Sequence, residues 1–331
     1  MTPRRNLLAA ALASPALALP ALVFPAMAQP SPFDRPLRLV IPYPPGGGTD
    51  AFGRRIAARL ALELGQTVVV ENRTGAAGAI GVGEVLRARP DGYSLLFGGA
   101  STHALYPLIA TRPQYDPVAD FVQVALLGSN TVCFIARKEV AEDLGTLLAK
   151  ARAAPGRLRF GSPGAGTYVH LAGEYLLHAA GGVEMLHVPY RGNGPAMIDL
   201  LAGNIDAVVD TVVTGLPQHQ EGRVRMLAVA SLERSSLAPE VPTVQEAIGL
   251  RGFEAQLWSL LSVRRETPAP LVAALHAACL RMLGAADFQA ELRAAGVEPA
   301  APMTPDEVAA YVRAEQAKWR PVVQATGEKM E

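Results

Sequence analysis

The chain has 331 residues, with 30 lysines and arginines against 30 aspartates and glutamates, so its formal net charge is zero. This balance argues against a nucleic-acid binder, which would show a strongly basic face. A chain of this length usually folds into two domains or lobes.

The first 28 residues have the pattern of an export signal. Arg4 and Arg5 precede an uncharged segment rich in Ala, Leu and Pro, which ends in Ala26-Met27-Ala28, a pattern that signal peptidases accept. A membrane anchor is the alternative, but prolines interrupt the apolar segment. We therefore predict a signal peptide over residues 1–28 and a soluble mature protein in the periplasm. The Sec and twin-arginine export routes both stay open.

From residue 37 onward, short β-branched segments alternate with segments rich in Ala and Leu. The first five are predicted to be strand 37–42, helix 51–64, strand 67–71, helix 81–89 and strand 93–98. This alternation is typical of βαβ units on a parallel sheet. The sequence therefore predicts an α/β fold.

The second part of the chain repeats this order. The glycine-rich turns at 45–49 and 163–167 each follow a predicted strand, lead into a predicted helix and lie 118 residues apart. Arg73 and Arg191, which follow the next strand of each part, have the same spacing. Two aligned turns in the same context indicate two lobes that are built alike, whether or not they share descent.

The C-terminal part mixes one strand with helices. Residues 225–231 are predicted to form a strand, and residues 270–283, 287–295 and 304–318 amphipathic helices. The last helix has a clear start signal, with Thr304 as N-cap, Pro305 at the first position and acids in the first turn. Cys133 and Cys279 are expected to be buried free thiols, although export would permit a disulfide.

Four loops are candidates for ligand binding, because ligands of open α/β sheets bind at the carboxyl ends of the strands. The loops 44–50 and 162–167 are rich in glycine and lead into helices. Glycine lets backbone N–H groups approach a ligand, and a helix N-terminus adds about half a positive charge. Both loops therefore favour a carboxylate or a phosphate, and the loops 101–103 and 190–192 would complete the walls.

Several of these residues have a purely structural alternative. Thr49 and Asp50 could cap a helix, and the glycine-rich turns could be simple connections. Arg191 could pair with a surface acid. Asp210 ends an apolar strand, so we expect it to face the cleft or a cap rather than the core, and in the cleft it would suit a ligand ammonium, a hydroxyl group or a bound water.

Motifs of enzymes and metal sites are incomplete in this sequence. The first loop lacks the Gly-Lys-Ser/Thr ending of a P-loop, and Phe160-Gly161-Ser162-Pro163-Gly164 misplaces the first glycine of a nucleophile elbow. His170, Glu174 and His178 share one helix face, but no further ligand cluster accompanies them. We therefore predict no catalytic residues, no metal site and no cofactor.

The ordered set of these loops resembles a known family, the substrate-binding proteins of tripartite tricarboxylate transporters, also called Bug or TctC proteins. The resemblance runs from about Arg35 to the C-terminus. It rests on the segments Tyr43-Pro44-Pro45-Gly46-Gly47-Gly48-Thr49-Asp50, Val70-Glu71-Asn72-Arg73-Thr74-Gly75-Ala76-Ala77-Gly78, Pro90-Asp91-Gly92-Tyr93, Ser101-Thr102-His103-Ala104, Gly161-Ser162-Pro163-Gly164-Ala165-Gly166-Thr167, His187-Val188-Pro189-Tyr190-Arg191-Gly192, Leu227-Ala228-Val229-Ala230-Ser231 and Val241-Pro242-Thr243-Val244-Gln245-Glu246-Ala247.

The resemblance implies a two-lobed α/β periplasmic-binding-protein fold (type II-like) with a ligand cleft between the lobes. It implies a first lobe of residues 29–135 with 236–331, completed by the C-terminal helices, and a second lobe of residues 136–235. It also implies a monomer that captures a dicarboxylate, a tricarboxylate or an amino acid. The ligand-binding residues expected from the loops and the resemblance are Tyr43, Pro44, Pro45, Gly46, Gly47, Thr49, Asp50, Ser101, Thr102, His103, Ser162, Gly164, Gly166, Thr167, Tyr190, Arg191 and Asp210.

The chain departs from the family pattern at three places. Tyr106 stands where asparagine is usual, Trp258-Ser259-Leu260 lacks a usual glycine, and Arg264-Arg265 replaces an apolar stretch. The first departure leaves the ligand class open, and the others are expected to touch the hinge or the surface. The sequence predicts a receptor that delivers a carboxylate to membrane permease subunits. The alternatives are a sensor that presents the carboxylate to a membrane signalling receptor and, more remotely, an exported hydrolase.

Overall fold

One hydrogen-bonded sheet organises the described part of the chain. The computed structural model describes residues 32–327 and Lys329, so the predicted signal peptide lies outside the described residues. The sheet has ten strands, eight of them in the order β2-β1-β3-β9-β4-β7-β5-β6, while β8 and β10 pair with β4 beside this path. Strand β4 (Phe121–Ala136) divides this sheet into two halves, because its beginning and its end have different neighbours.

The first sheet half consists of five strands and the beginning of β4. Strands β1, β2 and β3 are parallel, whereas β9 runs antiparallel to β3 and to β4. Its other strands are β1 (Leu37–Ile41), β2 (Val68–Asn72), β3 (Ser94–Gly99), β9 (Gln256–Arg264) and β10 (Val297–Pro299). The helical segments that accompany it are α1 (Gly48–Leu64), η1 (Ala76–Gly78), α2 (Ala79–Arg87), η2 (Ala100–Leu105), α3 (Tyr106–Ile109), α9 (Ala269–Gly284), α10 (Ala286–Ala294) and α11 (Pro305–Thr326).

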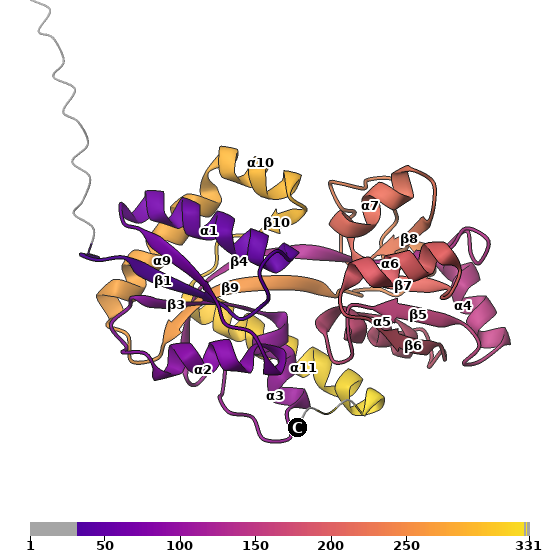
Figure 1. The fold of residues 1–331 in the computed structure, drawn as a ribbon, viewed down its shortest axis with the longest axis horizontal. Coiled ribbons are helices and arrows are strands. Elements are labelled where there is room, and N and C mark those ends of the chain that lie inside the picture. Colours follow the sequence, from indigo (N-terminus) through magenta and orange to yellow (C-terminus); the bar gives the residue numbers. More distant parts are fainter. Residues whose placement is uncertain (1–31, 328, 330–331) are drawn as a thin grey trace, which may run out of the picture. The chain divides into compact units, whose positions relative to one another are not determined.

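Alternation along the strands places a separate core on each face of the first sheet half. Leu39 packs into a cluster with residues of α1 and α9, whereas its neighbour Val40 packs into a cluster with residues of α2. Leu95 and Leu96 of β3 divide between the same two clusters. Since successive side chains of a strand point to opposite faces, both faces are apolar and helices cover both (Figure 1).

The second sheet half is built around the end of β4, over residues 132–136. Strands β5, β6 and β7 are parallel to one another, while β7 and β8 are antiparallel to β4. The strands are β5 (Arg159–Ser162), β6 (Leu186–Pro189), β7 (Ala207–Thr211) and β8 (Arg225–Val229). The helices are α4 (Leu144–Ala153), α5 (Tyr168–Ala179), α6 (Asn193–Ala202), α7 (Val212–Gln220) and α8 (Val244–Ile248).

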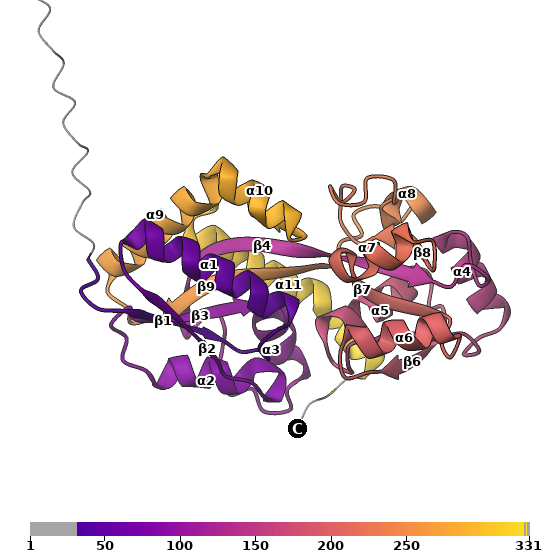
Figure 2. The same cartoon turned by 45° about the horizontal axis from the view of Figure 1, so that its top comes forward.

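Two long strands, β4 and β9, carry the chain between the sheet halves (Figures 1 and 2). The two pair from Phe121↔Arg264 to Thr131↔Gln256, with irregularities on either side of Leu126. Gly128 lies at one of them with φ 152°, and a Cβ there would come within 2.6 Å of the Glu298 carbonyl oxygen of β10. From Val132 onward β4 pairs with β7 instead. The lobe boundaries at residues 135/136 and 235/236 stay a prediction.

The elements expected from the sequence are present with small shifts at their ends, and the predicted α/β class is confirmed. Thr304 caps α11 as predicted, because its hydroxyl accepts from the Glu307 N–H and the Glu307 carboxylate accepts from the Thr304 N–H. The helix continues past the predicted end at Lys318 and through Pro321. Burial of Val322 and Val323 in the core holds this last part in place.

The sequence interpretation did not include β9 as a strand. Residues 257–263 are apolar apart from Ser259 and Ser262 and are mostly buried, so they show no alternation between polar and apolar residues. A strand that is buried on both faces lacks the period-two pattern that identifies a half-buried strand.

A buried carboxylate joins β9 to the C-terminal helix. Glu315 accepts hydrogen bonds from the indole N–H groups of Trp258, at 2.9 Å, and Trp319, at 3.2 Å. Lys318 forms an ion pair with the same carboxylate. Trp319 also contacts Tyr168 at the start of α5 edge-on, with ring centroids 4.7 Å apart. Helix α11 therefore contacts both sheet halves.

Among the described residues, no single helix is both long and apolar enough to cross a membrane. Helices α9 and α10 would qualify together by length and composition alone, but they meet at a bend of 73°. Both cysteines, Cys133 and Cys279, are described, and both are buried and free, as predicted.

Replacing Glu315 tests the importance of this junction. We expect Glu315→Ala to lower the free energy of unfolding by about 3 kcal/mol, because two buried indole N–H groups lose their acceptor. Glu315→Gln keeps an acceptor oxygen and should lose clearly less. Urea denaturation followed by tryptophan fluorescence measures both, and equal losses for the two variants would contradict the assigned role.

Candidate ligand-binding site

A pocket lies where loops of the two sheet halves face each other. Its volume is about 450 Å³. The first sheet half contributes segments that follow β1, β2 and β3, and the second contributes the loop between β5 and α5. The lining residues are Pro42, Tyr43, Pro44, Thr74, Gly75, Ala77, Gly78, Ser101, Ile109, Ala165, Gly166, Thr167 and Lys329. The pocket therefore forms at the carboxyl ends of parallel strands, as the sequence predicted for a ligand.

The first glycine-rich loop is held by Asp50, a buried carboxylate at the start of α1. Its Oδ2 accepts from the Gly46 N–H at 2.9 Å and from Arg54 at 3.0 Å, and its Oδ1 accepts from Asn72 at 2.8 Å. Burial opposes ionisation, but these hydrogen bonds outweigh it and lower the pKa of Asp50. Asp50 therefore shapes the loop from below and does not line the pocket.

The start of α1 itself has no side-chain cap in the described chain. Its N-cap is Gly47, and the residues 44–48 of the loop are exposed. The first turn of a helix leaves backbone N–H groups without intrahelical partners. An uncapped, exposed helix start of this kind can accept an anion.

The second glycine-rich loop is held by side chains from three elements. The Thr167 hydroxyl caps α5 by accepting from the His170 N–H at 3.2 Å, and it donates to the Gly164 carbonyl at 2.7 Å. Ser162 is fully buried, and its Oγ lies 2.7 Å from Nε2 of His187 on β6. The same hydroxyl also contacts the Gly164 carbonyl and N–H.

Two stacked histidine rings support this loop from beneath. The rings of His170 and His187 have centroids 3.7 Å apart and an interplanar angle of 18°. His170 Nδ1 accepts from the Gly166 N–H at 3.1 Å, and its Nε2 lies 3.5 Å from Glu174. Burial, together with the nearby His170, lowers the pKa of His187 to about 4. His187 is therefore neutral at physiological pH and accepts or donates as a polar support, without a charge.

The third wall comes from the π-helical segment η2 after β3. Ser101 lines the pocket beside Tyr43. Burial raises the pKa of the Tyr43 phenol, while hydrogen bonds with the Ser101 and Thr102 side chains act in the opposite direction. Thr102 is fully buried and bonds back to Gly99 through its hydroxyl. His103 is also fully buried, beside Phe121, and burial lowers its pKa to about 3.

Tyr190, Arg191 and Asp210 do not line the described pocket. The Tyr190 hydroxyl donates to Asp199 at 2.7 Å, and burial and this contact raise its pKa to about 12. Arg191 is exposed and makes no ion pair within the described part of the chain. Asp210 is fully buried; its Oδ1 accepts from the Thr211 N–H at 2.6 Å and from the Asn193 and Thr214 side chains. Asp210 thus supports the turn into α7, whose N-cap is Thr211 and has no side-chain cap hydrogen bond.

The predicted site residues fall into three groups. Those in the pocket lining are Tyr43, Pro44, Ser101, Gly166 and Thr167. Those that are buried beneath the loops are Asp50, Thr102, His103, Ser162 and Asp210. Those that lie outside the lining without being buried are Pro45, Gly46, Gly47, Thr49, Gly164, Tyr190 and Arg191. Their ligand contacts stay a prediction.

The segment after β2 is a wall that the predicted site residues did not include. Ala76 and Ala77 have φ of 47° and 51°, so this turn holds two alanines in the left-handed region. Gly78 follows with φ 96°, and a Cβ there would come within 2.6 Å of the Thr102 side chain. Glycine is therefore needed for η1 to approach η2. The position of 74–78 directly after a parallel strand was the signal that could have identified this wall.

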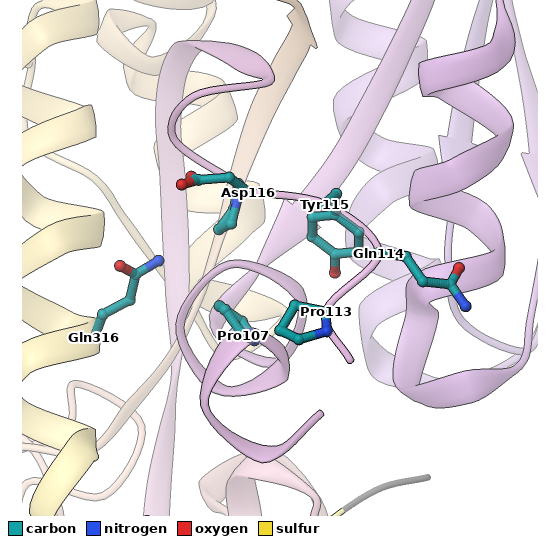
Figure 3. A pocket seen from close by; sticks show the side chains of 7 residues that line it. Pro107, Pro113, Gln114, Tyr115, Asp116 and Gln316 are labelled. Carbon is teal, nitrogen blue, oxygen red and sulfur yellow. The ribbon is translucent and has the colours of Figure 1, made fainter. Parts of the chain in front are cut away.

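A second pocket lies away from these loops, around residues 113–117 (Figure 3). Its volume is about 470 Å³, and Pro107, Pro113, Tyr115 and Gln316 are among its lining residues. The Asp116 carboxylate there accepts from the Val118 and Ala119 N–H groups. Neither glycine-rich loop contributes to the lining of this pocket. We therefore assign the predicted anion site to the first pocket.

The chemistry of the first pocket is that of binding. The Ser162–His187 pair has the separation of a nucleophile and its base, but the hydroxyl is buried and bonds its own loop. Within the described residues, no group of three or more His, Cys, Asp or Glu side chains is placed to hold a metal ion. What the pocket lining offers is hydroxyl groups, backbone N–H groups next to the start of α5, and one lysine.

Asp50 is expected to be more important for stability than an exposed aspartate with a similar partner. We expect Asp50→Ala to lower the free energy of unfolding by about 3 kcal/mol, because the Gly46 N–H, Arg54 and the Asn72 amide lose a buried, charged acceptor. Asp287 pairs with Arg59 but its side chain is 71% exposed, so Asp287→Ala should change stability by less than about 1 kcal/mol. Chemical denaturation compares them, and equal losses would contradict the role of Asp50.

Acid should loosen the second loop through His187. The folded-state pKa of His187 lies near 4, below the ordinary 6.5. Between these two pH values His187 is therefore protonated in the unfolded chain but neutral in the folded chain. The stabilisation is complete above pH 6.5 and is lost as the pH falls toward 4, by about 3 kcal/mol. His187→Gln should remove this part of the pH dependence in urea denaturation at pH 7 and pH 4.5.

The difference between wild type and His187→Gln isolates this histidine. Burial raises the pKa of Asp210 to about 6, so Asp210 makes the folded state more stable as the pH falls through this range. This contribution is the same in wild type and variant, and it cancels in their difference. The same pH dependence in wild type and variant would exclude His187 as the support of the loop.

Comparison with known proteins identifies the family. Residues 52–328 match the model of the tripartite tricarboxylate transporter family receptor. A UPF0065 protein of Pseudomonas sp. (strain P51) is 38% identical over 293 residues, covering 87% of this chain and 85% of that protein. BugT of Bordetella pertussis is 32% identical over 300 residues, covering 89% of this chain and 90% of BugT.

Solved structures agree over nearly the same span. The periplasmic binding protein BugD superimposes with a TM-score of 0.76 at 32% identity, covering 90% of this chain and 99% of BugD. MatC from Rhodopseudomonas palustris with bound malate gives 0.75 at 34% identity, covering 88% and 99%. An R. palustris protein with adipate gives 0.78 at 32% identity, covering 89% and 98%. The predicted periplasmic-binding-protein fold is confirmed, and the chain belongs to the TctC family of tripartite tricarboxylate transporter receptors, which are binding proteins rather than enzymes.

Proposed function

We propose that this receptor captures a small carboxylate in the pocket between the two glycine-rich loops and delivers it to permease subunits in the membrane. The observation that carries the proposal is the composition of the pocket. Tyr43, Ser101 and residues 74–78 come from the first sheet half, and Ala165 to Thr167 from the second. One small molecule can therefore contact both halves at once.

A ligand that contacts both halves explains how binding could be signalled to a partner. Only the conformation in which both sets of loops reach the ligand gains the full interaction energy, so the ligand shifts the population toward that closed form. We propose residues 29–135 with 236–331 and residues 136–235 as the two lobes that close. A permease that recognises the closed form would accept loaded receptors preferentially.

The class of ligand follows from the lining. The N-termini of α1 and α5 both adjoin the pocket loops, and helix starts favour anions. A pocket of about 450 Å³ accommodates a small organic acid. Relatives that share about a third of their residues with this chain were solved with adipate and with malate. We therefore propose a carboxylate with a second polar or charged end, bound by a monomer in the periplasm.

A thermal-shift panel tests this proposal. Malate, succinate, adipate, citrate and aspartate are added to the mature protein, and at least one should raise the Tm in a saturable manner, because a ligand that binds only the folded state stabilises it. Pull-down from membranes with and without that ligand then separates a permease partner from a sensor.

A blocking variant links the thermal shift to this pocket. Ala165→Trp fills the pocket from an exposed position and should abolish the shift, whereas Ala290→Trp, on the exposed side of α10, should retain it. No shift with any carboxylate, or an equal shift in Ala165→Trp, would contradict the proposed function or its site.

A further inference from the structure

The proposed carboxylate site has one formal charge in its described lining. Twelve of the thirteen lining residues carry no charged group, and the exception is Lys329. Among these described residues none has a carboxylate, so the pocket itself provides no anion to neutralise the ammonium. A dicarboxylate that entered it would meet one cationic side chain in the lining and, at the adjoining loops, the partial charges of two helix starts.

The fold brings this lysine to the pocket from the far end of the sequence. Helix α11 contacts η2 and α3 of the first sheet half and α5 of the second. Its Trp319 packs on Tyr168, the residue that follows Thr167 in the chain. The end of α11 is therefore anchored beside the second glycine-rich loop, only a few residues before Lys329.

The way α11 ends directs the chain toward the pocket. Gly327 adopts the left-handed conformation with φ 67°, and its N–H bonds back to the Val323 carbonyl. This is the usual way in which a glycine terminates a helix and turns the chain away from the helix axis. Lys329 follows two residues later and lies in the lining.

Other cations near the loops do not occupy this position. Arg73 follows β2 but its guanidinium pairs with Glu71 at 3.0 Å. Arg54 pairs with Asp50, and Arg191 is exposed outside the lining. Of the three, none lines the pocket, whereas Lys329 does.

We propose that Lys329 is a specificity-determining residue, which pairs with the second carboxylate of a ligand whose first carboxylate lies at the helix starts, and so favours dianionic over monoanionic acids. The inference rests on the proposed function, because it assigns a role within the same site. A lysine ammonium on a flexible stem suits this role as a point charge. Since Lys329 is exposed, its contribution is modest and depends on salt.

Titration calorimetry with malate as the probe measures the effect. At low ionic strength we expect Lys329→Gln to raise the Kd about two- to five-fold, in line with exposed ion pairs. Lys329→Arg should retain the wild-type affinity. In 0.5 M NaCl the difference between Lys329→Gln and wild type should shrink, because salt screens exposed charges.

Arg320 provides the matched control. It is an exposed cation of α11 that lies outside the pocket lining. Arg320→Gln removes the same unit of charge from the same C-terminal part of the chain, and it should leave the Kd unchanged. An equal loss in the two Gln variants would show a long-range effect of net charge and overturn the direct contact.

A second readout does not depend on affinity. The chain has four lysines, Lys138, Lys150, Lys318 and Lys329, so ¹³C-methylation of the amines gives few NMR signals. The signal that disappears in Lys329→Arg should shift on addition of malate, with the same midpoint as the calorimetric titration. If malate binds without shifting this signal, and if Lys329→Gln binds malate as tightly as the wild type, the role of Lys329 is overturned while the proposed function stands. A wild-type protein that binds no carboxylate would overturn the proposed function and this inference with it.

Discussion

Backbone pairing along β4 is the constraint on which the rest of the structure depends. One strand of 16 residues pairs with β9 over its first part and with β7 and β8 over its last part. The strands of both sheet halves are therefore aligned by hydrogen bonds to the same strand. The irregular pairing around Leu126 and Gly128 bends and twists the strand where it passes β10. Because both glycine-rich loops follow strands of these halves, the ladder also decides which loops can line one pocket.

The polar groups of the site divide into those that build the loops and those that face the pocket. Asp50 and His170 accept hydrogen bonds from the N–H groups of Gly46 and Gly166 in the loops above them. Such groups are buried and already partnered, so they keep the backbone N–H groups of the loops in place. Pre-organised donors do not have to be ordered when the ligand arrives, which lowers the entropic cost of binding. A change in one of them would act on binding through the loop.

Electrostatics distinguishes the two glycine-rich loops although they have corresponding positions in the sequence. The first begins α1 without a side-chain cap, whereas Thr167 caps α5. The first helix start therefore keeps more backbone N–H groups available for an anion. Lys329 is one of the residues that line the pocket to which both loops contribute. The site thus combines backbone dipoles with one exposed lysine, and weak, screened attraction of this kind suits a receptor that must bind its ligand and later release it.

The sequence by itself determined the elements and the edge of the sheet at which the ligand would bind. Glycine-rich turns after β-branched segments are local features, so residues 44–49 and 162–167 could be identified without a structure, and the order of motifs identified the family. The tertiary structure decided which residues face the pocket. Asp50, Ser162 and His103 have the residue types of a binding site, but neighbours distant in sequence, such as Asn72, His187 and Phe121, bury them. Lys329 carries no local signal, because its position depends on the tertiary packing of α11, which includes the contact of Trp319 with Tyr168. Local pattern sets the conformation of a segment, whereas burial and proximity depend on contacts that a single sequence does not display.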